Sequence, residues 1–241
     1  MVSQGRFTDR FNRGISVILP AYNEEANIST TIRRAIDYLS QTVADYEIIV
    51  VNDGSHDKTE QIVYWLTQLH PQVRLITHAH NKGYGAALVT GFTSTRKELA
   101  FFMDSDGQFN ISDLALLLPH ISNHDAVLGY RKERQDRWMR ILNATCWKLL
   151  IRLFFGVRVK DVDCAFKLFR ADFFHQTRLE TTGAMINTEI MFKWMQQGLT
   201  YTEVPVQHLP RLAGRATGAK ISVIIRALQE LFIFAEKWSH V

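Results

Sequence analysis

Two aspartates separated by one serine end the apolar run ELAFFMDSDGQFN. If the strand pattern continues through them, Asp104 and Asp106 share a face and their carboxylates can reach one point. Two such carboxylates repel each other unless a cation or a shared proton relieves them. Gln108, two residues further on, offers a third oxygen. Oxygen donors without His or Cys favour Mg²⁺ or Mn²⁺, which keep positions open for substrate phosphates. The pattern therefore predicts a metal site rather than two surface acids.

Similar polar clusters follow three other predicted strands. PAYNEE follows strand 15–20, NDGSHDKT follows strand 46–52, HNKGYGAA follows strand 73–78, and DSDGQ closes strand 98–104. Each cluster has a structural alternative: Asn23 could cap a helix, and Asp57 with Glu60 could form a capping box. Four clusters at the carboxyl ends of neighbouring strands favour a shared ligand instead, because these ends converge at one edge of a parallel sheet.

The elements that must position these clusters alternate along the first half of the chain. Helical patterns near 24–40, 57–69, 82–96 and 111–121 separate the strands, and a fifth strand is predicted at 125–130. Continuous apolar strands of this kind predict an α/β fold with a mostly parallel sheet and helices on both faces. The second half predicts a basic helix at about 137–155, the strand CAFKLFR, a helix at 187–197, the strand LTYTEVPV, and a terminal helix from about 219.

Composition narrows the function classes. The chain has 241 residues, 46% hydrophobic residues and a formal charge of +4, and residues 129–160 carry nine Lys/Arg against two acids. A local cationic patch predicts a specific anionic ligand or surface, whereas nonspecific nucleic-acid binding spreads its basic residues, so no nucleic-acid partner is expected. The charged start and the lack of about 18 consecutive apolar residues predict neither a secretory signal nor a membrane span. Cys146 and Cys164 match no ligand spacing, which predicts buried thiols and a cytoplasmic protein.

Together these motifs resemble family 2 glycosyltransferases with the GT-A fold. The resemblance rests on VILPAYNEE, on VVNDGS with Asp57 and Thr59, on Asn81, Gly83 and Ala87, and on DSDGQ. DVDCAFKLF and EVPVQHLPRLAGRATGAK are similar to the branch with dolichyl-phosphate mannosyltransferase and bacterial polyprenyl-phosphate glycosyltransferases. The resemblance covers about residues 15–238. It implies a single catalytic domain over 1–241, with a nucleotide-sugar lobe at about 15–130 and an acceptor lobe at about 131–241 that ends in an amphipathic helix.

The resemblance also implies roles for matched residues on the donor side. The metal, Mg²⁺ or Mn²⁺, would be held by Asp104, Asp106 and Gln108. Ser105 replaces an alanine that is common in the family, which we expect to matter little, and Asn52 replaces a common aspartate, which leaves the base preference open between GDP-mannose and UDP-glucose. The residues implied to contact the nucleotide-sugar are Pro20, Ala21, Tyr22, Asn23, Glu24, Asp53, Lys82, Asp104, Ser105, Arg211 and Lys220.

A polyprenyl phosphate acceptor is already anionic and needs cations rather than a general base. The segment GYRKERQDRWMR supplies them directly after the fifth strand. By resemblance Arg131 and Arg140 are the leading candidates, with Asp104 and Asp106 the other catalytic residues; Arg137 and Arg215 are further phosphate candidates, and Arg134 is less certain. Arginine suits phosphate through its planar donor fork. The loop RLAGRATGAK, with its two glycines and three cations, is expected to close over the diphosphate and exclude water.

Several alternatives stay open. Asp161 matches the acid that the family places before CAF and could orient the sugar or a basic residue, but with a hydroxyl acceptor Asp161 or Asp163 would be the base. Glu189 could contact the sugar or be structural. A sugar nucleotidyltransferase would carry a glycine-rich loop where PAYNEE stands, and a non-catalytic nucleotide-binding module would not need Asp104 and Asp106.

The amphipathic segments 138–155 and 221–238 could pack in the core or lie on a membrane. We therefore expect an inverting glycosyltransferase that moves a sugar from a nucleotide-diphospho-sugar to a polyprenyl or dolichyl phosphate. It would be peripheral to the cytoplasmic face of a membrane or bound to a membrane-anchored partner. Transfer to a hydroxyl acceptor in polysaccharide or glycoconjugate synthesis is the alternative.

Overall fold

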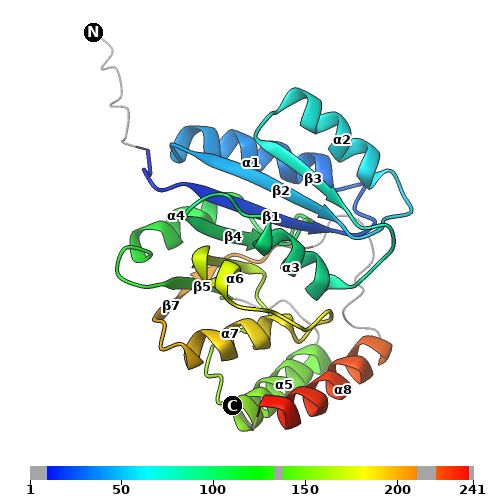
Figure 1. Cartoon of the computed structure of the whole chain (residues 1–241), viewed down its shortest axis with the longest axis vertical. Coiled ribbons are helices and arrows are strands. Elements are labelled where there is room, and N and C mark those ends of the chain that lie inside the picture. Colours follow the sequence, from blue (N-terminus) through cyan, green and yellow to red (C-terminus); the bar gives the residue numbers. More distant parts are fainter. Residues whose placement is uncertain (1–9, 133–137, 211–220, 239–241) are drawn as a thin grey trace.

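One sheet runs through the molecule with helices on both faces (Figure 1). The computed structural model describes residues 10–132, 138–210 and 221–238, except for the side chains of 138–146 and 221–227. The sheet in this part of the chain has seven strands in the order β3-β2-β1-β4-β6-β5-β7. Their bounds are β1 (Ile15–Ala21), β2 (Tyr46–Asn52), β3 (Val73–Thr77), β4 (Leu99–Met103), β5 (Ala126–Arg131), β6 (Phe166–Arg170) and β7 (Tyr201–Val206).

The central strands are continuous apolar runs because helices cover them on both sides. Every residue of β1 and β4 is buried, as is all of β2 after Tyr46. The neighbours β3, β2, β1 and β4 pair in parallel, and β5 pairs in parallel with β7. β6 is antiparallel to both β4 and β5. The predicted α/β fold with a mostly parallel sheet is confirmed.

The connections between strands place the helices and create a switch point. Helices α1 (Ile28–Thr42) and α2 (Thr59–Leu69) lead from β1 through β2 to β3, and α3 (Tyr84–Thr93) leads back past them to β4. Because such crossovers are right-handed, this reversal puts α3 on the opposite face from α1 and α2. β1 and β4 are neighbours at the reversal, which is where parallel sheets bind ligands. The clusters PAYNEE and DSDGQ therefore end side by side.

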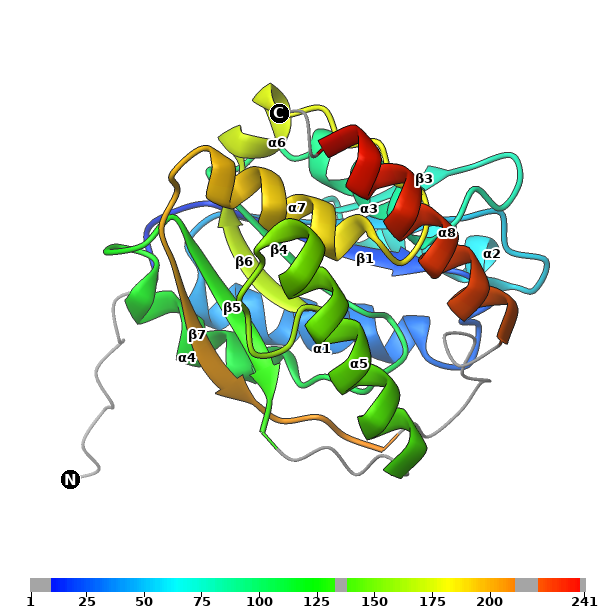
Figure 2. The ribbon, with the colours of Figure 1, turned by 90° about the horizontal axis from the view of Figure 1, so that it is seen from below.

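The second half of the chain is woven into the same sheet. β6 lies between β4 and β5, so the sheet crosses the expected lobe boundary near residue 130 without a break. Helices α6 (Asp172–Gln176) and α7 (Ile186–Gln196) join α3 on its face, while α5 (Trp138–Phe155) and α8 (Ile221–Trp238) lie side by side below α7 (Figures 1 and 2). Trp238 of α8 stacks on Phe192 of α7 and contacts Phe155 of α5.

The structure departs from the predicted elements at three places. α1 begins at Ile28 rather than near residue 24, because residues 22–27 form a loop that binds the loop after β2. The helix predicted at 111–121 is broken into η1 (Ile111–Asp113), α4 (Leu114–Leu117) and η2 (Leu118–His120), with Pro119 in the last. α6 was not predicted.

Two sequence expectations outside the sheet can be compared with the structure. Cys164 is fully buried and free, and burial raises the pKa of its thiol to about 12. A thiol in this state is a small apolar core group rather than a nucleophile. Within the described residues, no helix combines the length and the apolar character that crossing a membrane requires.

Candidate active site

The DSD segment forms a bend at the carboxyl end of β4. The chain does not stay extended after Met103: residues 105–107 bend, and Gly107 takes a φ of +76°. Asp104 is half-buried and accepts a hydrogen bond of 3.0 Å from the Tyr84 hydroxyl. Asp106 is 7% exposed and accepts one from the Gln108 backbone N–H at 3.0 Å. Both carboxylates are therefore oriented by this chain, but by a bend rather than by strand alternation.

Ser105 fastens this bend to the neighbouring strand. Its side chain is 2% exposed and its hydroxyl donates to the backbone carbonyl of Pro20 at the end of β1. Its own carbonyl accepts from the Thr31 hydroxyl of α1 at 3.1 Å. Alanine at this position could not make the bond to Pro20, and whether the serine matters for activity stays a prediction. Any contact of Ser105 with a ligand would therefore come from its backbone.

Gln108 makes two hydrogen bonds to Leu209, in the segment that follows β7. Its side-chain amide donates to the carbonyl of Leu209, 3.1 Å away, and its own carbonyl accepts from the Leu209 N–H at 2.8 Å. Gln108 thus holds the segment that follows β7 against the bend.

The donor set of the bend suits a hard cation. Among the described residues no group of three or more His, Cys, Asp and Glu side chains is placed to hold a metal ion. Asp104 and Asp106 offer two carboxylates at one bend, which fits Mg²⁺ or Mn²⁺ when water and substrate phosphates complete the shell.

Tyr84 links the bend to α3. It is the first residue of α3, between Gly83 and Gly85, and its hydroxyl donates to Asp104. Burial of the hydroxyl, then the charge of Asp104, raises the pKa of Tyr84 well above its ordinary value, and Asp163 and Asp106 act in the same direction. The phenol therefore stays protonated and acts as a donor, and Asp163 lies near enough to the bend for its charge to act there.

Asp53 is a structural anchor for the turn before α3. Its carboxylate, 3% exposed, accepts from the backbone N–H groups of Lys82 and Gly83 at 2.9 Å each and pairs with His78 Nδ1 at 2.7 Å. Contact with a base or ribose, which the resemblance implied, would compete with these bonds. The Lys82 side chain is exposed at the same edge.

The loops after β1 and β2 bind each other. Asn23, in a left-handed conformation with φ of 55°, donates its N–H to Ser55 Oγ at 2.9 Å and accepts from the His56 N–H at 2.8 Å. It is therefore a bridge between loops and not a helix cap. The Glu24 N–H donates to Thr59 Oγ1, and the Glu25 N–H to Asp57.

The implied nucleotide residues of this region differ in exposure. Pro20 and Ala21 are buried in β1, Tyr22 and Asn23 are exposed, and Glu24 is half-buried. Asn52 is fully buried, and its side-chain oxygen accepts the Ser55 N–H at 3.1 Å, so it shapes the turn. The capping box left open as an alternative for Asp57 and Glu60 does not form: α2 has no side-chain cap, and the Glu60 carboxylate accepts from Asn52 and Thr77.

Arg131 and Asp161 form a two-pronged ion pair at the same edge. Arg131, the last residue of β5, places Nε 2.7 Å from Asp161 Oδ2 and Nη2 2.8 Å from Oδ1. Burial alone would lower the pKa of Arg131, but the hydrogen bonds and charge of Asp161 raise it, so the guanidinium stays charged. Asp161 is 9% exposed and Asp163 is exposed. Asp161 therefore orients a basic residue, one of the three roles left open for it.

Lys167 supports the turn that carries Asp161 and Asp163. It is 1% exposed, near the start of β6, and its ammonium donates to the carbonyls of Val162 at 2.8 Å and Cys164 at 2.5 Å. Burial lowers the pKa of Lys167, while nearby Asp161 and Asp163 oppose that shift. A lone lysine in the apolar run CAFKLF was the signal that could have identified it.

Residues 16–178 match the family model described as Glycosyl transferase family 2, which is more than half of the chain. The chain belongs to glycosyltransferase family 2. Among curated relatives, it is 34% identical over 175 residues to the dolichyl-phosphate beta-glucosyltransferase ALG5D of Trichomonas vaginalis, covering 66% of this chain and 54% of that one. It is 28% identical over 219 residues to the dolichyl-phosphate beta-glucosyltransferase of Saccharomyces cerevisiae, covering 80% and 66%.

A bacterial relative extends this set. The chain is 28% identical over 159 residues to the undecaprenyl-phosphate 4-deoxy-4-formamido-L-arabinose transferase of Aeromonas hydrophila, covering 65% of this chain and 48% of that one. The chain thus spans about half to two thirds of the length of these three curated relatives.

A solved structure shares the fold. Glucosyl-3-phosphoglycerate synthase from Mycobacterium tuberculosis, in complex with Mn²⁺, uridine diphosphate and glucosyl-3-phosphoglycerate, superposes with a TM-score of 0.70. It is 20% identical and the match covers 92% of this chain and 80% of that one. The family 2 and GT-A predictions are confirmed.

Several predicted site residues of this family 2 chain lie outside the described part. Backbone and side chain of Arg134, Arg137, Arg211, Arg215 and Lys220 are among them, and of Arg140 only the backbone in α5 is described. Their predicted roles stay predictions.

The structure decides between the two roles left open for Glu189, a sugar contact and a structural acid. Glu189 is fully buried in α7 and accepts from the N–H groups of Glu180 and Thr181, from the Thr181 hydroxyl, and from Lys193. Of the two alternatives left open for it, the structure shows the structural one. It was ambiguous in the sequence because its partners lie in a loop that no motif marks.

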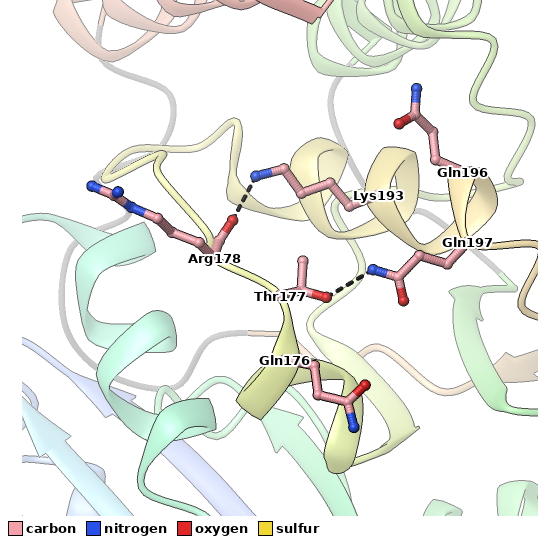
Figure 3. Close-up of a pocket in the computed structure, with 6 residues that line it drawn as sticks. All are labelled: Gln176, Thr177, Arg178, Lys193, Gln196 and Gln197. Carbon is pink, nitrogen blue, oxygen red and sulfur yellow. Dashed lines mark hydrogen bonds between the residues drawn. The ribbon is translucent and has the colours of Figure 1, made fainter. Parts of the chain in front are cut away.

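A surface hollow elsewhere is distinct from this site. It has a volume of about 360 Å³ and is lined by Gln176, Thr177, Arg178, Lys193, Gln196 and Gln197 (Figure 3). Gln176 ends α6, which follows the antiparallel β6, so the hollow lies toward the amino ends of the other strands. Lys193 donates to the Arg178 carbonyl and Gln197 to Thr177, which makes its wall part of the α6–α7 contact.

Proposed function

We propose that this chain is the catalytic part of an inverting glycosyltransferase that moves a sugar from a nucleotide-diphospho-sugar to a polyprenyl phosphate. The observation that carries the proposal is the Arg131–Asp161 pair, which sets a charged guanidinium at the same sheet edge as Asp104 and Asp106. The names of the relatives support a polyprenyl-phosphate acceptor, and glucosyl transfer among them supports UDP-glucose over GDP-mannose as the donor.

The residues divide the work by charge. When bound, Mg²⁺ or Mn²⁺ supplies positive charge against the diphosphate, and Asp104 and Asp106 would hold it. Arg131 would bind the acceptor phosphate, one of whose oxygens attacks the anomeric carbon as the bond from that carbon to the diphosphate oxygen breaks. The nucleoside diphosphate leaves from the opposite face, so the configuration inverts. Since the phosphate attacks as an anion, no protein base has to remove a proton.

The decisive experiment offers the protein donors and acceptors in parallel. With Mn²⁺, UDP-glucose, GDP-mannose and a short polyprenyl phosphate, we expect a glucosyl phospholipid by mass spectrometry. Arg131→Ala should raise the KM for the lipid phosphate about tenfold or more, as expected when a charge-assisted bond is lost. Transfer to a hydroxyl acceptor, with none to the lipid phosphate, would contradict the proposal.

A hydroxyl acceptor is the second candidate, and Asp163 is the observation in its favour. Asp163 is exposed and lies close enough to Tyr84 for its charge to act on that hydroxyl. If Asp163 were a general base, Asp163→Asn would abolish turnover at unchanged acceptor KM. For a phosphate acceptor, we expect Asp163→Asn to retain turnover.

A polyprenyl acceptor would bring the protein to a membrane, and α5 with α8 offers a suitable face. Among the side chains described on these two helices, five large apolar ones are exposed, and the ring centroids of Phe154 and Phe232 lie 6.0 Å apart. Lys148 and Arg152 lie exposed beside them, and α5 contains no acid. This apolar face consists of Leu149, Leu153, Phe154, Phe232 and Ile233.

We expect the apolar face to lie on an anionic bilayer surface at the cytoplasmic side, since apolar and basic side chains together favour headgroup contact. Vesicles of phosphatidylglycerol should bind the protein more strongly than vesicles of phosphatidylcholine. Leu149→Ser with Leu153→Ser should weaken this binding, whereas Trp65→Ser, which is also exposed but on α2, should not. Equal binding of both variants, or binding only through a membrane-anchored partner, would count against this face.

A further inference from the structure

The loop formed by residues 180–183 lies between α8 and the metal-site bend. We propose that this loop, fixed by buried Glu189, is a positioning element: it sets the first turn of α3, whose Tyr84 orients Asp104. The proposal rests on the proposed function only in taking Asp104 as a metal ligand. Glu189 acts through other residues and touches no substrate, so it is a positioning residue.

Glu189 fixes the loop from below. Its carboxylate oxygens accept from the Glu180 N–H at 2.9 and 3.0 Å, from the Thr181 N–H at 2.8 Å and from the Thr181 hydroxyl at 2.7 Å. Lys193 Nζ, one turn along α7, lies 2.7 Å from Glu189 Oε1. Burying a carboxylate costs free energy unless donors pair with it, so loss of any of these partners is unfavourable. The bonds reach the loop backbone and therefore set its path.

The loop in turn caps α3. The Thr182 carbonyl accepts from the N–H groups of Gly85 at 2.9 Å and Ala86 at 3.3 Å, and α3 has no side-chain cap. The first N–H groups of a helix need such an external acceptor. A Cβ on Gly83 would lie 2.5 Å from the Thr182 carbonyl oxygen, and one on Gly85 would lie 2.7 Å from that of Thr181. The two backbones are thus in direct contact, and a shift of the loop would shift the helix start.

Tyr84 sits between these two glycines and carries the contact to the site. Asp53 holds the N–H groups of Lys82 and Gly83 on one side of the turn, and Thr182 holds those of Gly85 and Ala86 on the other. The Tyr84 side chain is therefore fixed at its base, and its hydroxyl meets Asp104 Oδ1 at 3.0 Å. A partner that orients a metal ligand in this way commonly tunes the affinity for the metal.

Helix α8 rests on the far side of the same loop. Lys237 pairs with Glu180 at 2.7 Å, and a Cβ on Gly183 would lie 2.5 Å from a carboxylate oxygen of Glu230. The loop thus contacts α3 on one side. On the other side it contacts α8, which carries Phe232 and Ile233 of the apolar face. Any displacement of α8 at a membrane would shift the loop that positions Tyr84, and through Tyr84 it would affect Asp104.

The test is a double-mutant cycle read by binding and by hydrogen exchange. Glu189→Gln keeps the shape but replaces one acceptor oxygen by an NH₂ group, so the donors that bond to that oxygen lose their acceptor. We expect the affinity for Mn²⁺ with UDP to fall about tenfold in Glu189→Gln and in Tyr84→Phe, the range typical of partners of metal ligands. If the loop acts through Tyr84, the double variant should bind no more weakly than either single variant.

Hydrogen exchange and a matched control separate positioning from loss of stability. Exchange at the amides of Gly85 and Ala86 should speed up in Glu189→Gln and stay slow in Tyr84→Phe. Glu47→Gln, another buried carboxylate-to-amide change, lies at the opposite edge of the sheet and should lower the melting temperature while leaving Mn²⁺·UDP affinity unchanged.

Three results would overturn the proposal. The first is additive effects of Glu189→Gln and Tyr84→Phe on Mn²⁺·UDP affinity, and the second is an equal loss of that affinity in Glu47→Gln. The third is a failure of the unsubstituted protein to bind UDP in a manner that depends on Mn²⁺. Because none of these measurements uses an acceptor, failure of lipid glycosylation alone would contradict the proposed function and leave this positioning role standing.

Discussion

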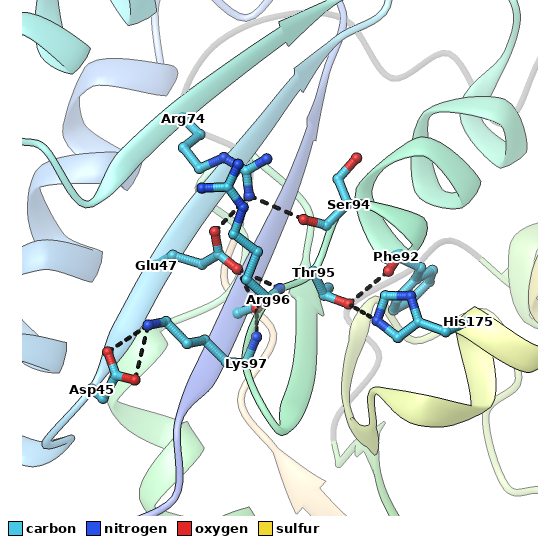
Figure 4. Close-up of polar contacts among 10 residues, drawn as sticks. Asp45, Glu47, Arg74, Phe92, Ser94, Thr95, Arg96, Lys97 and His175 are labelled. Carbon is cyan, nitrogen blue, oxygen red and sulfur yellow. Dashed lines mark hydrogen bonds and ion pairs between the residues drawn. The ribbon is translucent and has the colours of Figure 1, made fainter.

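The two edges of the sheet both collect acidic side chains, but they use them differently. At the amino edge Glu47, 5% exposed, accepts from Ser16 Oγ at 2.7 Å and from the Arg96 N–H at 2.7 Å, and pairs with Arg74 at 2.6 Å (Figure 4). At the carboxyl edge Asp104 is half-buried and bonds to the neutral Tyr84 hydroxyl.

The different surroundings of these acids distinguish carboxylates that stabilise the fold from carboxylates that can take part in chemistry. The amino-edge acids bind the starts of strands and their connections, as Asp45 does with Lys97 in the same view (Figure 4). The carboxyl edge places exposed or half-buried polar groups at several strand ends, among them Tyr22, Lys82, Asp104 and Asp163. Glu47 is enclosed by donors of the chain and serves stability, whereas Asp104 is oriented but left accessible and can serve a ligand.

Removing the charge at the carboxyl edge should have the largest effect on activity. In Asp104→Asn we expect glycosyl transfer to fall at least about 100-fold, because a lost metal ligand weakens charge stabilisation at the diphosphate. Rates with saturating Mn²⁺ and the melting temperature would be measured together. The control Asp45→Asn changes a carboxylate at the amino edge and should keep full activity. A fully active Asp104→Asn would break the contrast between the two edges.

The reverse experiment changes the amino edge. Glu47→Gln removes the charge that faces Arg74, and we expect the free energy of unfolding to fall by about 3 kcal/mol, as when a buried pair is broken. Urea unfolding gives this value, and the specific activity of the folded fraction well below the melting temperature should be unchanged. If transfer fell with no loss of stability, Glu47 would belong with the carboxyl-edge acids.

The sequence predicted the strands well because each central strand is a continuous apolar run between turn residues. It also placed the clusters at one edge, since parallel strands align their carboxyl ends. The pairings between these clusters could not be predicted, because Tyr84 and Asp104 are 20 positions apart and Arg131 and Asp161 are 30 apart. Such pairs depend on which strands become neighbours, and the insertion of antiparallel β6 between β4 and β5 had no local signal in the sequence.

The same limit explains why the partners of Ser105 and Asp53 could not be predicted. Ser105 looked replaceable by alanine because its partner, the Pro20 carbonyl, is a backbone group 85 positions away. The contact of Asp53 with a base or ribose was implied by the resemblance alone, and its partners His78 and Lys82 lie 25 and 29 positions away.

Asp161 tests whether an acid at the carboxyl edge acts only by orienting a basic residue. If Asp161 only orients Arg131, Asp161→Asn should raise the KM for polyprenyl phosphate about tenfold, which corresponds to about 1.4 kcal/mol, and change kcat little. Asn retains one acceptor oxygen for Arg131, so the fold should persist. Steady-state kinetics against lipid phosphate separates the two constants. A collapse of kcat at unchanged KM would instead make Asp161 a proton acceptor and favour the hydroxyl-acceptor alternative.

The smallest expected effect concerns the pH dependence of the loop contact at the carboxyl edge. Burial alone would raise the pKa of Asp57, but hydrogen bonds from the Thr59 hydroxyl and N–H and from the Glu25 N–H lower it below its ordinary value of 3.8. A lowered pKa means that the charged form favours the folded state. Its contribution is therefore complete above about pH 4 and is lost as the pH falls through the lower folded-state pKa.

Melting temperatures of the unsubstituted protein and of Asp57→Asn should accordingly differ at pH 6 and converge toward pH 3. Asp37→Asn, at an exposed position of α1, serves as the control, and its difference from the unsubstituted protein should not follow this course. A gap for Asp57→Asn that stayed constant down to pH 3 would show that the loops after β1 and β2 are held together by shape rather than by the charge of Asp57. That contact would then not depend on an ionised carboxylate, unlike the Glu47 cluster at the amino edge, and the contrast between the two edges would be sharper.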